Sequence, residues 1–390
     1  MDLSKLFTHW WQFLFYAFCL VSAIQLFFHW AYFRRVAFFK PKIKEKSQQH
    51  PVSVIVCAKD DAANLAKNLP GLLVQTYPTT HEIIVVNHNS LDETKYLLEE
   101  FLKTFKSLHI VTLSQEAKGI PGKKYPLSMG IKEAKHEIVL LTDADCVPAS
   151  EFWMHKMQDG YDEETEVVIG YGAYHKRPGV FNKIVRFETF HSALQYFSLA
   201  LAGMPYMGVG RNLSYKKSLF LNNKGFSSMN HVPGGDDDLF INLVANKQNT
   251  RVVIDPEAFT LSESKKNFTQ WVRQKNRHFT TGKYYKPKHK FILGLYSVSQ
   301  FLYYPLFIAS IIFYDWRIVL GVFALRLFSQ AFIYNRSMKK LNETDLFPWW
   351  LLLDIWMFIY YCIFAPALWR KPQKTWNSSP NTSQILARDN

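Results

Sequence analysis

The stretch E-I-V-L-L-T-D-A-D-C-V-P, residues 137–148, decides which fold this chain is expected to adopt. Its apolar, β-branched part, residues 138–142, is typical of a parallel strand that is covered on both faces. Two carboxylates one residue apart, Asp143 and Asp145, follow, and Pro148 ends regular pairing. Because open α/β sheets bind ligands at the carboxyl ends of their strands, the acidic pair stands where a ligand would bind.

The D-x-D spacing allows both side chains to share a divalent cation, which can also hold diphosphate oxygens. Without such a cation, two carboxylates about 4 Å apart repel by roughly 4 kcal/mol at an effective dielectric constant of about 20. The alternative is a solvated turn after a strand, since D-x-D also recurs by chance. From this stretch alone, the two interpretations carry equal weight.

The composition indicates a polar domain combined with membrane segments. The 390 residues are 48% hydrophobic and carry a formal charge of +14, yet the mean hydropathy is near neutral at -0.11. A basic excess can reflect nucleic acid, anionic lipid or positive-inside membrane topology. The membrane is favoured because lysines and arginines cluster beside apolar runs: Arg34, Arg35 and Lys40 to Lys46 follow the first run, and Arg336, Lys339 and Lys340 follow the third. No nucleic-acid partner is expected, and the four cysteines have no disulfide or zinc spacing.

The first apolar run, residues 10–33, is long enough to span a bilayer. A cleaved signal peptide is the alternative, because Lys5 precedes the run and V-S-A at 21–23 resembles a cleavage site. The apolar character continues to Phe33 and ends at two arginines, which favours an uncleaved anchor with its basic end in the cytoplasm.

Three later runs, 291–313, 316–334 and 347–369, are also long enough to span, so the protein is expected to be a multi-pass protein of the inner (cytoplasmic) membrane. Asp354 lies in the last run and would cost roughly 2.5 to 3.5 kcal/mol in lipid, so it is expected to face protein or water. Three later spans would place Arg370 and Lys371 outside, against the positive-inside bias, which suggests that one segment is re-entrant or interfacial. The expected divisions are an anchor at 1–40, a basic linker at 41–51, a soluble domain at 52–286, a membrane region at 287–370 and a polar tail at 371–390.

The soluble domain shows the pattern of an α/β fold. Short apolar runs at 52–56, 83–86, 109–113 and 138–142 alternate with helix-period segments, which indicates βαβ units on a mostly parallel sheet. Ser90 and Glu93 stand in capping-box register and predict a helix start there. Carboxylates or amides follow three of the strands, which is hard to attribute to solvation alone.

Six motifs in order resemble those of the inverting family 2 glycosyltransferases, which have the GT-A fold. They are S-V-I-V-C-A-K-D-D-A-A-N-L (53–65), E-I-I-V-V-N-H-N-S-L-D-E-T (82–94), G-K-K-Y-P-L-S-M-G-I (122–131), T-D-A-D (142–145), G-G-D-D-D-L-F (234–240) and Q-K-N-R-H (274–278). The resemblance covers about 52–282 and is to the membrane-anchored branch with Q-x-x-R-W-type motifs. That branch includes cellulose, hyaluronan and poly-N-acetylglucosamine synthases and lipid glucosyltransferases.

The resemblance implies a donor site at the strand ends. Ala58 and Asp61 would contact the nucleotide, with a solvated helix-start carboxylate as the alternative for Asp61. Asp143 would contact the sugar or ribose, and Asp145 would ligate Mg²⁺ or Mn²⁺ on the diphosphate. Lys123 would steady the donor, although an ordinary surface lysine is nearly as plausible.

A departure from the family pattern follows the second strand. Asn87 and His88 stand where the family usually has Asp-Asp or Asn-Asp. The identity of the nucleotide is therefore open, with UDP as the default.

Asp236, Asp237 and Asp238 resemble the family's acidic motif that supplies the general base. Three adjacent carboxylates raise one another's proton affinity, which suits a base at neutral pH. Register with the family motif makes Asp236 the first choice and Asp237 the second. The alternative is a cluster that caps the helix expected to start near Leu239.

The motif Q-x-x-R-W is matched by Gln274, Arg277 and His278, with His in place of Trp. In the family this Trp forms part of the platform on which the acceptor stacks, so the sequence leaves open whether the acceptor stacks on His278. Arg277 suits a leaving diphosphate because a guanidinium pairs with two phosphate oxygens. Residues 208–214 resemble the segment that lines the acceptor channel. Residues 187–207 are expected to form either an amphipathic interface helix or a core helix.

The expected function is metal-dependent, inverting transfer of a sugar from a nucleotide donor to a lipid or glycan hydroxyl at the cytoplasmic membrane face. One alternative is a processive polysaccharide synthase, for which four or fewer spans provide little channel wall. Another is a catalytically degenerate protein that binds glycans or scaffolds an assembly, suggested by Asn87, His88 and His278.

Overall fold

The computed structural model describes residues 10–41, 50–115 and 119–366, and these form two compact units. Unit 1 contains 10–41, Lys176–Pro205 and 266–366; unit 2 contains 50–175 and Tyr206–Lys265. The expected linker lies mostly outside the described residues, and the expected polar tail lies wholly outside them.

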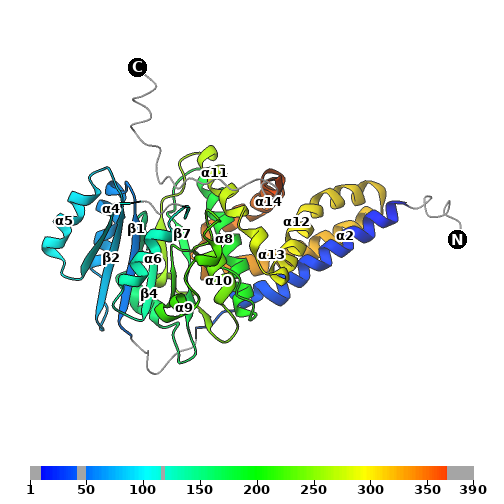
Figure 1. The fold of residues 1–390 in the computed structure, drawn as a ribbon. Coiled ribbons are helices and arrows are strands. Elements are labelled where there is room, and N and C mark those ends of the chain that lie inside the picture. Colours follow the sequence, from blue (N-terminus) through cyan, green and yellow to red (C-terminus); the bar gives the residue numbers. More distant parts are fainter. Residues whose placement is uncertain (1–9, 42–49, 116–118, 367–390) are drawn as a thin grey trace, which may run out of the picture. The chain divides into compact units, whose positions relative to one another are not determined.

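Unit 2 is built on a seven-stranded sheet of order β3-β2-β1-β4-β8-β6-β9 (Figure 1). Its first four strands in the chain are parallel to one another: β1 (Val52–Ala58), β2 (His81–His88), β3 (Leu108–Leu113) and β4 (Ile138–Asp143). The other half contains β8 (Leu213–Lys216), antiparallel to β4 and to β6 (Val167–Ile169), and β9 (Thr250–Val252), parallel to β6. All four predicted strands are confirmed, each somewhat longer than the apolar run that predicted it.

Helices cover both faces of the parallel half, which explains why its strands are apolar throughout. On one face, Val54 and Val56 of β1 join a core with Leu65 and Leu69 of α4 (Ala62–Leu73) and with Leu98 of α5 (Thr94–Thr104). On the other face lies α6 (Lys124–Glu133), where Gly130 permits close approach. A Cβ there would meet Ile55 of β1 at 2.7 Å and Val86 of β2 at 2.8 Å.

A second, three-stranded sheet follows the D-x-D motif. Its order is β5-β10-β7, with β5 (Cys146–Pro148), β7 (Gly172–Tyr174) and β10 (Thr260–Ser262). Pro148 is the last residue of β5 and stands opposite Thr260. The short helices of unit 2 are α7 (Trp153–Gln158), α9 (Lys217–Asn222) and α10 (Asp238–Val244).

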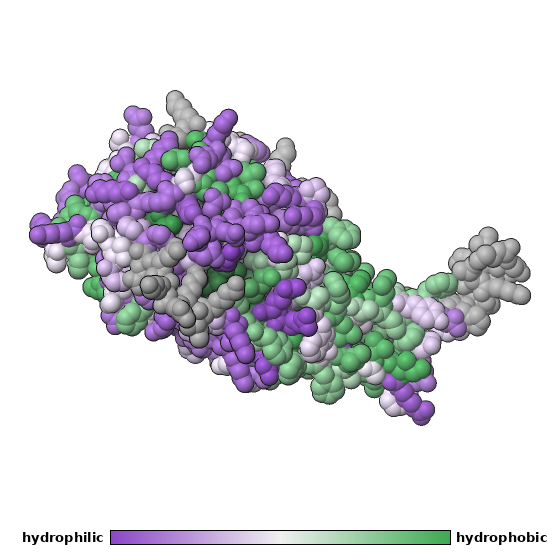
Figure 2. Space-filling model, turned by 90° about the horizontal axis from the view of Figure 1, so that it is seen from below, coloured by the Kyte–Doolittle hydropathy of each residue, from purple (hydrophilic) through white to green (hydrophobic). Residues whose placement is uncertain are grey.

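Unit 1 is helical. Its long elements are α2 (Trp10–Phe27), continued by η1 (Phe28–Phe33) and α3 (Arg34–Ala37), then α12 (Pro287–Phe313) and α13 (Trp316–Lys340). The last are η5 (Thr344–Trp349) and α14 (Trp350–Phe364). Four segments of the described chain are long and apolar enough to cross a membrane: Trp11–Ala37, Pro287–Phe313, Trp316–Lys340 and Thr344–Phe364. Figure 2 shows apolar side chains gathered over the membrane helices on the face that it displays. Phe291 of α12 and Phe328 of α13 are among the exposed large apolar side chains.

The interior of this helical unit contains a polar cluster. Arg326 of α13 pairs with Asp354 of α14 at 2.7 Å, and both side chains are at most 1% exposed. Gln25 of α2 accepts hydrogen bonds from Arg326, and Gln300 of α12 donates one to Asp354. Asp354 therefore faces protein, which is one of the two environments that the sequence analysis predicted for it.

Two helices that lie inside the expected 52–286 domain in sequence belong to unit 1. They are α8 (Val180–Leu201) and α11 (Phe268–Phe279). Buried residues occur around the whole circumference of α8, from Val185 to Leu199, so it is a core helix of this unit rather than an amphipathic surface helix. Glu188 of α8 forms a buried ion pair with Lys275 of α11.

Candidate active site

The carboxyl ends of β1, β2 and β4 meet at one edge of the large sheet. Ala58, the last residue of β1, stands opposite Asn87 near the end of β2, and Cys57 stands opposite Asp143 at the end of β4. Ala58 is fully buried and Asn87 is 4% exposed. The parallel register therefore brings Ala58, Asn87 and Asp143, which are far apart in sequence, to the same edge.

The loops after β1 and β2 are joined by hydrogen bonds. The backbone N–H of Asp60, which has a positive φ of 53°, donates to Ser90 Oγ at 3.0 Å, and that of Asp61 donates to Thr94 Oγ1 at 3.2 Å. The predicted capping box is wrong, because α5 begins at Thr94 with Glu93 as its N-cap, without a side-chain cap. Ser90 binds the neighbouring loop instead of its own helix.

Asp61 is a buried carboxylate held by this loop. Its side chain accepts hydrogen bonds from Asn64 Nδ2 at 2.9 Å and from the backbone N–H of Lys59 at 3.3 Å. Burial raises its pKa, and the negative charges of Asp145 and Asp143 raise it further against these hydrogen bonds. Asp61 is thus electrostatically coupled to the D-x-D pair and is not a solvated helix-start carboxylate.

His88 and Asn87 face different surroundings at the end of β2. The His88 ring is 5.9 Å from the ring of Tyr125 on α6 in an edge-on arrangement. The Oδ1 atom of Asn87 is buried without a hydrogen-bond partner among the described residues. A buried acceptor of this kind at a sheet edge is costly unless a ligand satisfies it.

The D-x-D pair offers ligands for a divalent cation. One ligand atom each from Asp143, Asp145 and Cys146 lie within 4.8 Å of one another, and Cys146 Sγ donates to Asp145 Oδ1 at 3.3 Å. Burial raises the pKa of Asp145, Asp143 adds to the rise, and Lys265 and Arg211 oppose it. Two carboxylates that repel each other fit Mg²⁺ or Mn²⁺, which prefer oxygen ligands.

Lys123 connects the D-x-D strand with the second acidic cluster. Its Nζ lies 2.8 Å from Asp143 Oδ1 and 3.3 Å from Asp236 Oδ2, and its side chain is only 19% exposed. Burial alone would lower its pKa, but Asp143, Asp236 and Asp237 raise it well above its usual value. Lys123 is therefore a charged lysine bound by carboxylates from both acidic motifs, and not an ordinary surface lysine.

The three consecutive aspartates differ in what they bind. Asp237 caps α10: its Oδ1 accepts from the backbone N–H of Asp238 and its Oδ2 from that of Gly210, both at 2.8 Å. Asp238 accepts from the backbone N–H of Leu239 at 2.8 Å. The helix-capping alternative thus holds for Asp237, whereas Asp236 is directed at Lys123.

Burial raises the pKa of Asp237 to about 7, with further contributions from Asp236 and Asp238. This pKa suits a base, but both of its carboxylate oxygens already accept backbone hydrogen bonds.

Residues 53–219, which contain the strand ends, Lys123 and the D-x-D motif, match the family described as Glycosyl transferase family 2. The chain contains a family 2 glycosyltransferase domain. Among relatives, it is 32% identical over 124 residues to a beta-monoglucosyldiacylglycerol synthase of Trichormus variabilis, covering 31% of this chain and 26% of that protein. It is also 24% identical to a probable glycosyltransferase, YdaM, of Bacillus subtilis, covering 75% of this chain and 74% of that protein. The first of these matches thus spans about a quarter of the length of its relative.

The fold also resembles a solved structure, the mannosyltransferase PcManGT of Pyrobaculum calidifontis in complex with GDP-Man and Mn²⁺. The TM-score is 0.56 at 18% identity, and the match covers 89% of this chain and 99% of that one. Together with the mostly parallel sheet, this shows the GT-A fold.

Arg211 is a residue of the glycosyltransferase domain to which the sequence reasoning gave no role of its own. Its Nη1 donates to Ser262 Oγ at 2.9 Å, and its guanidinium lies 4.5 Å from the ring centre of Tyr174. Its charge lowers the pKa of Asp145, so it lies close enough to influence the D-x-D pair. Its place in G-V-G-R-N-L-S, a predicted channel segment, was the signal that could have identified it.

Lys124 contacts the loop that leads into the acidic cluster at residues 236–238. It is 1% exposed, and its Nζ donates to the carbonyl oxygen of Val232, four residues before Asp236. Burial lowers its pKa, while Asp236, Asp238 and Asp237 oppose that shift. This contact ties the start of α6 to the loop that leads into the three aspartates.

Gln274, Arg277 and His278 lie on α11, which belongs to unit 1, whereas the acidic residues belong to unit 2. One face of α11 is buried through Trp271 and Lys275. Arg277 is half-buried and His278 is exposed. Their roles towards the diphosphate and the acceptor stay predictions.

Proposed function

We propose that this protein is an inverting glycosyltransferase that moves a sugar from a nucleotide-sugar donor to a hydroxyl of a lipid or glycan. The observation that carries the proposal is that the partly buried cation of Lys123 contacts both Asp143, in the predicted donor site, and Asp236, the predicted base. Membership of family 2 supports the reaction class. A UDP-sugar is the default donor.

The donor would bind at the carboxyl edge of the sheet. Asp61 and Asn87 would contact the nucleotide, since one is a buried carboxylate near the D-x-D pair and the other has an unused buried acceptor. Lys123 and Arg211 would offset the negative charge of the diphosphate from two sides of the D-x-D pair.

Asp145 and Asp143 would hold Mg²⁺ or Mn²⁺, and the mannosyltransferase with the similar fold was solved with Mn²⁺. The bound ion would supply Lewis-acid stabilisation of the negative charge on the leaving diphosphate.

Asp236 would act as the base. It would remove the proton from the acceptor hydroxyl as that oxygen forms its bond to the anomeric carbon, while the bond from that carbon to the diphosphate oxygen breaks on the opposite face. The electron pair of the broken bond stays with the nucleoside diphosphate. Asp236 is preferred to Asp237 because its carboxylate faces Lys123, whereas both oxygens of Asp237 bind backbone N–H groups.

The helices of unit 1 would place this reaction at the cytoplasmic face of the inner membrane, where nucleotide sugars are supplied. Four segments are long and apolar enough to span. A relative that shares the domain is named as a synthase of a glucosyl lipid, which supports a lipid acceptor.

The test is a screen of nucleotide sugars with the purified full chain and Mg²⁺ or Mn²⁺, in which the released nucleoside diphosphate is measured. Asp145→Ala and Asp236→Asn should each lower release by roughly 10²-fold or more. Glu133→Gln, an exposed acidic residue on α6, is the matched control and should leave release unchanged. Release that persists in both site variants would refute the proposed roles.

Two outcomes would favour the other functions. No release from any donor would favour the degenerate binding protein, which is motivated by Asn87 and His88 at the end of β2. Long products on a gel would favour a processive synthase over single or limited transfer.

A further inference from the structure

Two basic clusters that are about 300 residues apart in sequence meet at one end of unit 1. Arg34 and Arg35 are on α3, and Arg336, Lys339 and Lys340 are in the last two turns of α13. The structure packs α3 against α13. The cations that follow the first and the third apolar run therefore belong to one surface region.

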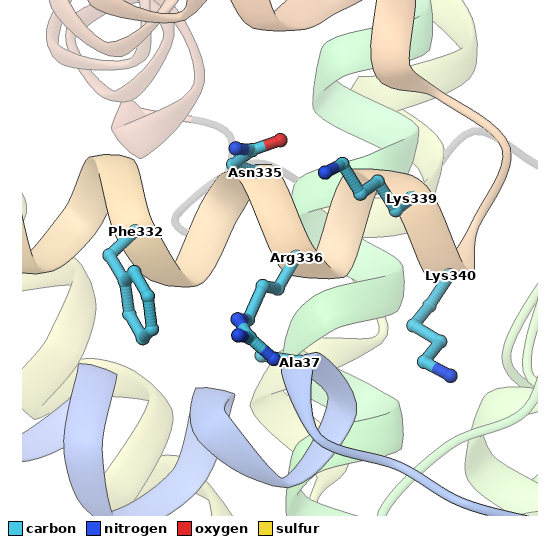
Figure 3. A pocket seen from close by; sticks show the side chains of 6 residues that line it. All are labelled: Ala37, Phe332, Asn335, Arg336, Lys339 and Lys340. Carbon is cyan, nitrogen blue, oxygen red and sulfur yellow. The ribbon is translucent and has the colours of Figure 1, made fainter.

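A hollow of about 550 Å³ lies in this region (Figure 3). Its lining residues are Ala37, Phe332, Asn335, Arg336, Lys339 and Lys340. Figure 3 shows Phe332, Arg336 and Lys340 extending from α13 on the side of α3, while Lys339 extends back along α13 towards Asn335. Three cations, one amide and the aromatic ring of Phe332 thus line this space.

The guanidinium of Arg336 is held in place by aromatic rings. It lies 4.6 Å from the ring centre of Phe38 and 5.1 Å from that of Phe332. Stacking of this kind restrains the plane of the guanidinium, whose planar fork matches two oxygens of one phosphate. The guanidinium of Arg336 is therefore pre-organised for binding an anion.

The three cations of the hollow have no acidic partner within the described residues. The nearest acids in sequence, Glu343 and Asp345, bind other cations: both pair with Arg186, and Asp345 also lies 3.1 Å from Lys176. The positive charge of Arg336, Lys339 and Lys340 is thus uncompensated. Lysines in the last turn suit the negative end of a helix dipole, but that effect does not account for Arg336 or for the hollow.

We propose that this hollow binds the phosphate of an anionic lipid headgroup. Arg336 pairs with the phosphate oxygens, Lys340 and Lys339 add charge, and Phe332 and Phe38 contact the apolar part next to the headgroup. A lipid is favoured over a free phosphate because α13 continues from this hollow into an apolar outer face that includes Phe328. The site is distinct from the donor site of unit 2 and does not depend on glycosyl transfer.

The test measures lipid binding to the purified full chain in neutral detergent, by native mass spectrometry and by the shift of the thermal unfolding midpoint. The probes are phosphatidylglycerol, phosphatidylcholine and inorganic phosphate. Phosphatidylglycerol should be retained and should stabilise the protein more than phosphatidylcholine does. In Arg336→Gln/Lys340→Gln, its apparent affinity should fall about tenfold or more, as expected when two cations near an anionic headgroup are removed.

A matched control removes two exposed lysines from the start of α12, Lys288→Gln/Lys290→Gln, and should keep the affinity of the wild type. Arg336→Lys, which keeps the charge but loses the planar fork, should retain part of the binding. Equal loss in the control, equal binding of phosphatidylcholine, or full stabilisation by inorganic phosphate alone would each overturn the lipid proposal.

Discussion

At the scale of single residues, Lys123 affects both the stability of unit 2 and the charge of the proposed site. Its Nζ contacts carboxylates from two separate acidic motifs, and the sequence motif alone could not distinguish it from a surface lysine. A cation with two carboxylate neighbours and little solvent contact contributes both to the fold and to the charge of the proposed donor site.

We expect Lys123→Met to lower stability and activity together. Leaving Asp143 and Asp236 without their cation should cost about 1 to 2 kcal/mol of folding free energy, between the values for exposed and fully buried ion pairs, because these side chains are 34% and 10% exposed. Donor turnover should fall roughly 10²-fold, as when one stabilising donor group is removed from an active site. Thermal unfolding and nucleoside diphosphate release measure the two effects. Lys132→Met, on the exposed side of α6, is the control, and equal effects in both variants would contradict this assignment.

Asp237 predicts a specific dependence of stability on pH. Its pKa is raised from 3.8 to about 7 in the folded protein, so the folded state binds more protons than the unfolded state between these values. Stability should therefore fall as the pH rises from about 4 to about 7. In Asp237→Asn this part of the fall should be absent. Asp61 and Asp145, whose pKa values are also raised, should still contribute to a fall of stability as the pH rises. The unfolding midpoint followed against pH tests this, and an unchanged slope in the variant would argue against it.

At the scale of helices, the polar cluster of unit 1 links α2, α12, α13 and α14 inside an apolar bundle. Asp354 receives hydrogen bonds from Gln300, Gln330 and Tyr304 in addition to its ion pair with Arg326. We expect Asp354→Ala to destabilise the protein by about 3 to 5 kcal/mol, because Arg326 stays buried without a counter-charge.

The double variant Arg326→Leu/Asp354→Leu is the control for this cluster. It should recover much of the loss, since an apolar pair replaces the buried charges. Unfolding midpoints in detergent give the comparison. If Asp354→Ala matched the wild type, the cluster would not be structural.

The shortness of α14 predicts the side of the membrane on which the chain leaves unit 1. Its 15 residues extend about 22 Å, less than the roughly 30 Å of a hydrocarbon core, so the segment Thr344–Phe364 is long enough to cross only together with η5. Tyr360 and Phe364 pack on Trp271 and Phe279 of α11, an amphipathic helix with an exposed basic face. We therefore expect α14 to lie at the interface without crossing, which agrees with the positive-inside bias.

Cysteine labelling tests this topology in a background without the four native cysteines. Pro366→Cys should react with a membrane-impermeant thiol reagent from the same side as Asn342→Cys, which follows α13. Labelling of the two positions from opposite sides would show that α14 spans.

At the scale of the whole molecule, the two units alternate along the chain, so unit 2 is not one continuous segment, and the stretch 53–219 that matches the family includes α8 of unit 1. The helices α8 and α11 leave unit 2 in sequence and pack with the apolar helices, where His191 lies 2.9 Å from the Tyr296 hydroxyl and Trp271 is fully buried. A fragment that ends at residue 286 would expose these surfaces.

We accordingly expect residues 1–286 to aggregate or to need detergent, even though the predicted later spans are absent. Size-exclusion chromatography of this fragment beside the full chain measures the outcome. A monodisperse fragment with wild-type donor binding would show that α12, α13 and α14 are not needed to cover α8 and α11.

The parallel strands, the acidic pair at the end of β4 and the apolar segments could be predicted from the sequence, because each depends on local periodicity or on spacing within a few residues. The folded chain was needed to show that Lys123 contacts both Asp143 and Asp236, that Asp237 is the aspartate that caps α10, and that Ser90 binds the loop after β1. These depend on which distant side chains the sheet register and helix packing bring within hydrogen-bond distance, a property that no local pattern encodes.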